Sequence, residues 1–268
     1  MEMGAFLDRH PARPTGRTPG KPDLLSGPDR SWDLVISGPG VFNAAVALTV
    51  CLEKFRPAFI LHTGIAGVFN GTGLNPGDAA VAVTDTYVHT GVDTGYPGSG
   101  DPGETGPGSN RPDPGGSASR SGQNPLKDPI HPSLRLAPLP FDLIPGHELS
   151  RQGIYDLDSN LADDCFRVLD RHLGCRVVQG PFITVSAVTG SLEKAHALSD
   201  AFSPVMESME GAAAAHVAAL YQVPMVEIRA ASNRVGDRDK TRWDIPAAVQ
   251  TVADICDTLL AKVPGHGI

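Results

Sequence analysis

The chain has 268 residues, a formal net charge of −8 and a sequence pI near 5.5. No basic patch stands out against this acidic balance, which argues against a partner with a phosphate backbone such as DNA or RNA. The longest apolar runs fall well short of the roughly 18 residues that a membrane span needs. Residues 1–17 are mixed and charged and lack the hydrophobic core of a signal peptide.

The four cysteines are scattered and form no Cys-x-x-Cys pair: Cys51, Cys165, Cys175 and Cys256. Three of them lie in apolar helical or strand contexts, which predicts buried free thiols in a reducing cytoplasm and disfavours disulfide bonds or zinc. The length fits one α/β domain, which we place at residues 31–263.

Residues 1–30 are expected to form an irregular N-terminal arm. A first helical turn fits residues 1–7, but five prolines between positions 11 and 28 exclude a long element after it. Because an α/β domain that opens without a strand is unusual, we expect the natural reading frame to extend upstream into an apolar strand.

The first clear strand is predicted at Asp33–Ser37, followed by a Gly-Pro-Gly turn and a helix over residues 41–55 with apolar residues on one face. Arg56-Pro57 ends that helix, and residues 58–62 form the next buried strand. This βαβ unit has only a weak glycine motif and lacks the acidic residue of a dinucleotide site, so NAD binding is disfavoured.

Small residues follow at Thr63–Gly67, where they either let a ligand approach the backbone closely or form a plain glycine turn. Residues 78–88 are predicted to be a strand. The Gly-, Pro- and Ser-rich segment at about 96–125 cannot bury enough apolar surface to offset its ordering, which predicts a disordered insertion. Residues 138–145 regain apolar character and are expected to pack at the domain edge.

In the second half, residues 158–160 are predicted to cap a helix that runs to about Leu173, and residues 176–186 form a strand. Ser191 caps a helix that ends at Phe202. Asp244 caps a last helix over residues 245–263, with a proline suitably placed in its first turn.

The stretch 205–239 is the most informative: a short strand at 205–207, an alanine-rich helix at 211–221 and a buried strand at 225–231. Glu207 and Glu210 lie where the first strand meets the helix. Glu210 has an alternative role as an N-terminal cap or dipole partner. Arg229 and Asn233 lie toward the carboxyl end of the second strand, where open α/β sheets hold their ligands, so a site is favoured here.

Four segments carry a family resemblance: DLVISGPGVFNAA, LHTGIAGVFNGTGLNPGD, ESMEGAAAAHVA and EIRAASNRVGDRD. They resemble the purine nucleoside phosphorylase and nucleosidase superfamily, and within it they look most like the futalosine hydrolases, menaquinone-pathway nucleosidases that release hypoxanthine from futalosine. The resemblance covers residues 33–90 and 155–262. It implies an α/β fold with a twisted mixed central sheet flanked by helices, a homo-oligomer, a small nucleoside substrate, and no metal or organic cofactor.

By position, the resemblance implies that Glu210 grips the ribose 2′ and 3′ hydroxyls, that Arg229 orders the water and nearby carboxylates, and that Asn233 faces purine N7. A carboxylate suits the first task because it accepts two hydrogen bonds and stabilises positive charge on the sugar. The other residues expected at the substrate are Thr63, Gly64, Ile65, Val188, Met209, Glu207 and Ser232. Arg234, Arg238 and His89 are candidates by charge alone for the carboxybenzoyl end.

Three departures from related families guide the choice of reaction. His62 stands where phosphorylases commonly carry a phosphate-binding arginine, which favours water as the nucleophile. Ile65 and Asn233 replace a serine and an aspartate of the methylthioadenosine/S-adenosylhomocysteine nucleosidases. Because an amide donates a hydrogen bond but delivers no proton, Asn233 fits the better leaving group hypoxanthine rather than adenine.

The superfamily hydrolases place a water-activating glutamate after their first strand. Glu2 is the best positional match, although with one residue before it we expect it to be poorly held. The sequence thus predicts hydrolysis of futalosine. The alternatives are a methylthioadenosine/S-adenosylhomocysteine or aminofutalosine nucleosidase, a phosphorylase, and a nucleoside-binding protein without turnover.

Overall fold

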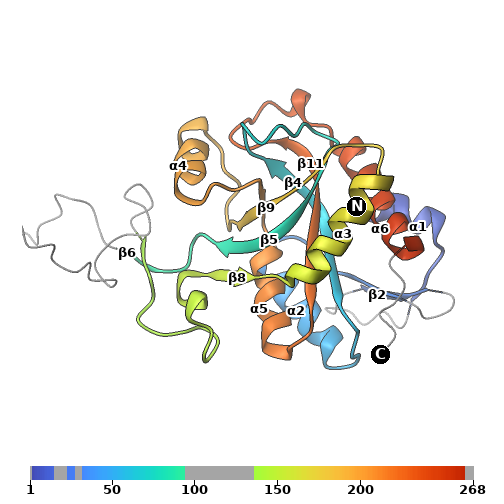
Figure 1. Ribbon diagram of the computed structural model, residues 1–268, viewed down its shortest axis with the longest axis horizontal. Helices are drawn as coiled ribbons and strands as arrows, with labels where there is room; N and C mark the ends of the chain where they lie inside the picture. The colour runs from blue at the N-terminus through green and yellow to red at the C-terminus, as the bar shows by residue number, and fades with distance from the viewer. Residues whose placement is uncertain (1, 15–22, 28–31, 94–135, 263–268) are drawn as a thin grey trace, which may run out of the picture.

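The structure is a computed structural model that describes residues 2–14, 23–27, 32–93 and 136–262 (Figure 1). The insertion expected at about 96–125 lies outside these residues. The helices are α1 (Gly4–Arg9), α2 (Val41–Leu52), α3 (Ser159–His172), α4 (Leu192–Phe202), α5 (Gly211–Tyr221) and α6 (Ile245–Lys262), with short 3-10 helices η1 (Glu148–Gln152) and η2 (Lys240–Arg242). The strands are β1 (Arg13–Pro14), β2 (Asp23–Ser26), β3 (Asp33–Ile36), β4 (Ile60–Val68), β5 (Ala79–Tyr87), β6 (Val92–Asp93), β7 (Leu136–Ala137), β8 (Ile154–Asp156), β9 (Val177–Thr184), β10 (Met206–Ser208) and β11 (Met225–Arg234).

Six strands of the described chain form the central sheet, in the order β11-β4-β10-β9-β5-β8. β4 is parallel to β11, and β9 is parallel to both β10 and β5. β10 is antiparallel to β4, and β8 is antiparallel to β5. β5 also pairs antiparallel with β11, so five of the six strands close into a ring. The predicted single α/β domain with a mixed central sheet is confirmed.

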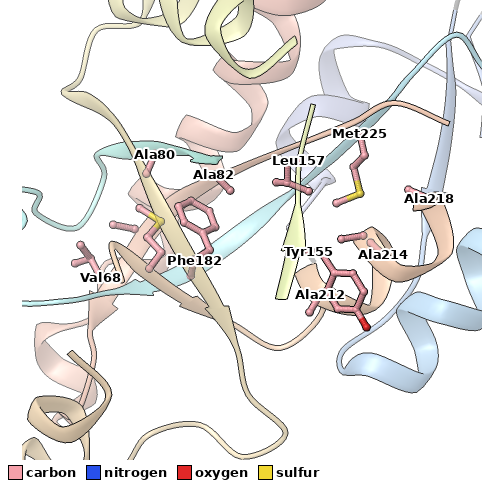
Figure 2. Close-up of a cluster of buried hydrophobic side chains, with 14 of the residues drawn as sticks. Val68, Ala80, Ala82, Tyr155, Leu157, Phe182, Ala212, Ala214, Ala218 and Met225 are labelled. Carbon is pink, nitrogen blue, oxygen red and sulfur yellow. The ribbon is translucent and has the colours of Figure 1, made fainter. Parts of the chain in front are cut away.

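Helices cover the sheet on two sides. α1, α3 and α6 lie together on one side, while α5 packs on the other with α2 outside it (Figure 1). Six of the 11 residues of α5 are alanine, and these short side chains let the helix approach the strands closely. Figure 2 shows Ala212, Ala214 and Ala218 of this helix in the core cluster that also holds Phe182 and Met225. The cluster fixes the start of α5 against the sheet.

The helix starts predicted from capping residues are confirmed. Asp158 accepts a hydrogen bond from the backbone N–H of Leu161 at the start of α3. Ser191 does the same for α4, and the Asp244 carboxylate accepts from a backbone N–H in the first turn of α6. All four cysteines are free, as predicted, and Cys165 and Cys256 are buried. Within the described ranges, none of the helices combines the length and hydrophobicity that crossing a bilayer requires.

Three predictions about the first half of the chain are wrong. The strand predicted to end at His62 continues through Thr63–Gly67 to Val68, so this segment is neither a glycine turn nor a loop. β3 pairs with β2 in a separate three-stranded sheet and not with β4, so the predicted βαβ unit does not form. α2 ends at Leu52 rather than at residue 55. In the arm, residues 4–9 form α1, whereas β2 was not expected.

Candidate active site

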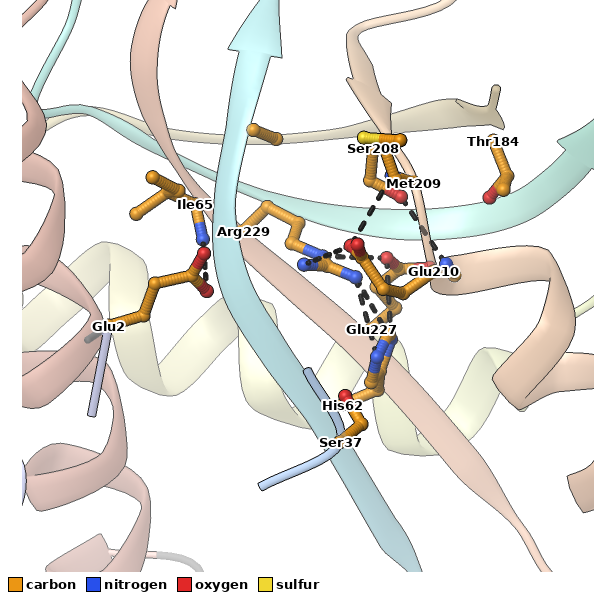
Figure 3. Close-up of polar contacts among 12 residues, drawn as sticks. Glu2, Ser37, His62, Ile65, Thr184, Ser208, Met209, Glu210, Glu227 and Arg229 are labelled. Carbon is orange, nitrogen blue, oxygen red and sulfur yellow. Dashed lines mark hydrogen bonds and ion pairs between the residues drawn. The ribbon is translucent and has the colours of Figure 1, made fainter. Parts of the chain in front are cut away.

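The structure brings Glu2, from the start of the chain, together with Glu210 and Arg229, from one unit near its end (Figure 3). Arg229 lies on β11 directly opposite Gly64 of β4. Because β11 extends to Arg234, Arg229 is at the middle of its strand and not toward the carboxyl end as expected. Glu210 lies between β10 and α5, and Glu2 lies just before α1.

Glu210 occupies the N-cap position of α5, but within the described residues its carboxylate does not cap that helix. Instead it accepts a hydrogen bond of 2.8 Å from the backbone N–H of Gly40 and one of 3.3 Å from that of Met209. Gly40 has φ +90° at the start of α2, a backbone conformation that favours glycine. The turn before α2 therefore presents its N–H to Glu210, and the capping alternative is wrong for its side chain.

Arg229 is buried among acidic groups, with 2% of its surface exposed. Its Nε donates to Glu227 Oε1 at 2.8 Å, its Nη1 lies 3.5 Å from Glu210 Oε2, and its Nη2 lies 3.2 Å from His62 Nδ1. Burial opposes the charge, but the carboxylates of Glu227 and Glu210 outweigh it and raise the pKa of Arg229. The guanidinium is thus a fixed cation at the centre of the site.

Glu2 reaches over β4 from its place before α1. Its Oε2 accepts a hydrogen bond from the backbone N–H of Ile65, at 3.3 Å. A Cβ at Gly64 would lie 2.6 Å from Arg229 Nη1 and 2.6 Å from Glu2 Oε2. Only a glycine leaves room for both groups over β4. Glu2 is exposed and is held over β4 by the bond from Ile65, so the expectation that it is poorly held stays a prediction.

Glu227 and Asp85 were missed in the sequence. Both are fully buried on neighbouring strands, and burial together with the charge of Glu227 raises the pKa of Asp85 well above its ordinary value. Burial alone would also raise the pKa of Glu227, but Arg229 and His62 outweigh it and hold that pKa at about 2. The signal that could have found the pair is an acidic residue inside each of two apolar strands.

Gly211 is where the two buried carboxyl groups meet α5. A Cβ there would lie 2.0 Å from Asp85 Oδ2 and 2.4 Å from Glu227 Oε2. Helix propensity alone would favour alanine by about 1 kcal/mol. We expect the steric overlap to outweigh the gain in helix propensity, so that Gly211→Ala lowers the free energy of unfolding by about 1–3 kcal/mol.

Urea denaturation measures this effect, with Gly174→Ala as the matched control because a Cβ there has no neighbouring atom within 4 Å among the described residues. Equal stability of the two variants would contradict the close packing at Gly211.

Glu207 is placed differently from its expected role. It is 6% exposed and accepts hydrogen bonds from the backbone N–H and the hydroxyl of Thr189. Burial raises the pKa of Glu207, and the bonds from Thr189 only partly offset that rise. The carboxylate therefore fixes the loop at 187–190, in which Val188 is 47% exposed, and does not point to Arg229.

The remaining predicted residues lie within or next to three strands: Thr63 within β4, Met209 directly after β10, and Ser232 and Asn233 near the end of β11. Asn233 donates from Nδ2 to the Arg234 carbonyl at 3.0 Å, and its Oδ1 accepts from the Ser232 hydroxyl at 2.8 Å. Met209 packs partly buried against the cluster of Ile183 and its neighbours. Within the described chain the buried hydroxyl of Thr63 has no hydrogen-bond partner.

The three candidates for the carboxybenzoyl end are not equivalent. The Arg234 guanidinium bonds to Asn70, Asn75 and the Leu74 carbonyl, so it anchors a turn. Arg238 lies over the Trp243 ring. His89 accepts from the backbone N–H of Ser186, beside the Tyr87 ring. In the described part of the chain, no group of three or more His, Cys, Asp or Glu residues could hold a metal ion.

Residues 33–263 match the model of a family described as the phosphorylase superfamily. In sequence the chain is similar to a futalosine hydrolase of Thermus thermophilus, at 35% identity over 130 residues that cover 48% of this chain and 55% of that protein. It is also similar to a 5′-methylthioadenosine/S-adenosylhomocysteine nucleosidase of Maridesulfovibrio salexigens, at 25% identity over 203 residues that cover 75% of this chain and 68% of that protein.

Among solved structures, a futalosine hydrolase of Helicobacter pylori shares the fold. The TM-score is 0.72 at 15% identity, and the match covers 97% of this chain and 93% of that one. The chain spans about half or less of the length of the curated futalosine hydrolases that it matches.

Proposed function

The chain belongs to the phosphorylase superfamily, and from this membership and the site geometry we propose that it hydrolyses the N-glycosidic bond of futalosine, releasing hypoxanthine and dehypoxanthine futalosine. The observation that carries the proposal is the placement of two carboxylates, Glu2 and Glu210, on either side of the buried Arg229 (Figure 3). Two acidic groups around one cation suit a reaction in which water attacks while positive charge grows on a sugar.

Each carboxylate has a distinct part in this proposal. Glu210 keeps lone pairs beyond its bonds to Gly40 and Met209, and these accept the ribose 2′ and 3′ hydroxyls. Its negative charge stabilises the oxocarbenium-like transition state, and Arg229 fixes its orientation. Glu2 takes the proton of the attacking water. Asn233 donates its second amide N–H to N7 of the departing purine.

The electrostatics of the site support water rather than phosphate as the nucleophile. The Arg229 guanidinium lies against the carboxylates of Glu227 and Glu210 and close to that of Glu2. This acidic surround repels a phosphate dianion. The side chain at the position of the phosphorylase arginine, His62, is engaged with Arg229 and Glu227.

The proposal is tested by offering futalosine, aminofutalosine, methylthioadenosine and inosine, each with and without phosphate, and measuring the free base. We expect the highest kcat/KM with futalosine and no dependence on phosphate. A preference for methylthioadenosine would instead support the activity of a methylthioadenosine/S-adenosylhomocysteine nucleosidase. The longer sequence match is to a protein of that kind. Tight hypoxanthine binding without turnover would replace the proposal with a nucleoside-binding protein, and phosphate-dependent turnover with a phosphorylase.

Asn233→Asp is expected to shift the preference from futalosine toward methylthioadenosine. A carboxylic acid delivers a proton to N7 of the poorer leaving group adenine, which the amide cannot do, and such proton transfer contributes about 10²–10⁴-fold. The ratio of kcat/KM values for the two substrates measures the shift, with Asn233→Ser as a control that supplies no acid. An unchanged ratio would remove Asn233 from the purine site.

A role in menaquinone biosynthesis, a cytoplasmic location and a homo-oligomeric state complete the proposal. The first and third follow from the resemblance, and the location follows from the free thiols. All three stay predictions.

A further inference from the structure

We propose that Asp85 and Glu227 share a single proton, carried by Asp85, and that this pair is the positioning unit for Arg229. The positioning role rests on the proposed hydrolysis, whereas the shared proton can be tested without any substrate. Neither residue is in the site expected from the sequence, and both are fully buried.

The first argument is the hydrogen-bond accounting of the two carboxyl groups. Glu227 Oε1 accepts from Arg229, and Asp85 Oδ1 accepts from the Thr184 hydroxyl at 2.8 Å. The other two oxygens, Asp85 Oδ2 and Glu227 Oε2, are buried and have no donor among the described residues. Both converge on the same point at Gly211. One proton between them satisfies both oxygens, while two charges there would repel each other with little solvent screening.

The surroundings decide which residue carries the proton. Glu227 touches Arg229 and lies 3.5 Å from His62 Nδ1, so its negative charge is compensated. Asp85 accepts from the Thr184 hydroxyl on β9 and pairs across β8 with the Tyr155 backbone. Burial and the charge of Glu227 raise the pKa of Asp85 and outweigh the positive charge of Arg229, which lowers it. The Tyr155 phenol is turned to His216 of α5. The charge therefore belongs on Glu227 and the proton on Asp85, in agreement with the opposite directions of their pKa shifts.

The pair connects the start of α5 to the guanidinium. The backbone N–H of Ala212 donates to the Thr184 hydroxyl at 2.8 Å, and that hydroxyl donates to Asp85. Asp85 then donates its proton to Glu227, which holds Arg229 Nε. Because Glu210 directly precedes α5, this chain of bonds fixes both the guanidinium and the carboxylate that it contacts.

Two substitutions at position 85 distinguish a side chain that donates a hydrogen bond to Glu227 from one that only fills the space. Asp85→Asn keeps an N–H for Glu227 and a carbonyl for Thr184, while Asp85→Leu keeps neither. We expect Asp85→Asn to retain most of the wild-type kcat, and Asp85→Leu to lose about 100-fold in kcat with a smaller change in KM, as a misplaced catalytic geometry does. Equal kcat values for the two folded variants would overturn the positioning role.

The proton itself is tested on the protein without substrate. Infrared spectroscopy at neutral pH should show a protonated carboxylic acid band that Asp85→Asn removes and Glu207→Gln, the control for the other buried acid of raised pKa, does not. A band absent from the wild-type protein, or one unchanged in Asp85→Asn, would overturn the shared proton. If neither variant at position 85 folds, Glu207→Gln still decides it: a band that persists in that variant supports the shared proton, and one that disappears overturns it.

Thermal unfolding gives a second readout. A folded-state pKa raised above the unfolded value of about 3.8 means that wild-type stability falls as pH rises toward the folded pKa. The unfolding temperature of Asp85→Asn, relative to that of the wild type, should therefore rise as the pH increases above about 4. The opposite trend would show that Asp85 is ionised. If no nucleoside is turned over, the proposed function fails while these two readouts still decide the shared proton.

Discussion

Glu210→Gln should lower kcat by about 10³-fold while the protein keeps its fold, because the variant loses the charge that stabilises the growing positive charge on the sugar. The amide oxygen still accepts from the Gly40 N–H, so the loss is one of charge more than of anchoring. Release of free base from the best substrate measures kcat, and circular dichroism checks the fold.

The control for this variant is Glu193→Gln, which removes the same charge from an exposed position on α4 and should leave kcat unchanged. Near-normal turnover of Glu210→Gln would refute the sugar-binding assignment of Glu210, and with it the reaction proposed for this corner of the molecule.

Arg229→Met should cost about 3–5 kcal/mol of unfolding free energy, since it leaves the fully buried charge of Glu227 without its main partner. Adding Glu227→Gln should restore much of that stability without restoring turnover, because the centre of the site is still missing. Chemical denaturation measures the first quantity and the substrate assay the second. Arg167→Met is the control, since Arg167 pairs with Asp164 at the surface and should lose far less.

The ion pair between Arg229 and Glu227 also predicts how the stability of the wild-type protein changes with pH. The folded-state pKa of Glu227, about 2, lies below its ordinary value of 4.5. Its stabilisation is therefore complete above pH 4.5 and is lost as the pH falls toward about 2. In Arg229→Met, the unfolding free energy that is lost when Glu227 becomes protonated should be smaller. If Arg229→Met/Glu227→Gln were as unstable as Arg229→Met alone, the destabilisation would come from lost packing and not from the unpaired charge of Glu227.

Local signals in the sequence predicted the elements that local chemistry controls. The caps at Asp158 and Ser191 and the full extent of α5 are set by residues a few positions away in the chain. The candidate site around Glu210 and Arg229 was also predicted from the sequence, because both residues lie next to well-defined elements of one supersecondary unit.

The structural features that the sequence did not predict depend on contacts between residues that are far apart in the chain. Thr63–Gly67 is weak in strand propensity, yet it is a strand because β11 pairs along it. Glu207 was expected at the substrate, but its direction depends on Thr189, 18 positions away. The placement of Glu2 depends on a backbone N–H 63 positions away, at Ile65. Each of these outcomes is a tertiary contact that no local pattern encodes.

The closed ring of strands has a consequence for how the site can move. Residues 228–230 of β11 pair with β4 on one edge and with β5 on the other, so Arg229 sits where the backbone is bonded on both sides. Moving the backbone of Arg229 would require opening the ring, which costs much more than shifting a surface segment. We therefore expect the flanking loops, such as 187–190, and not the backbone at Arg229, to adjust when a ligand binds.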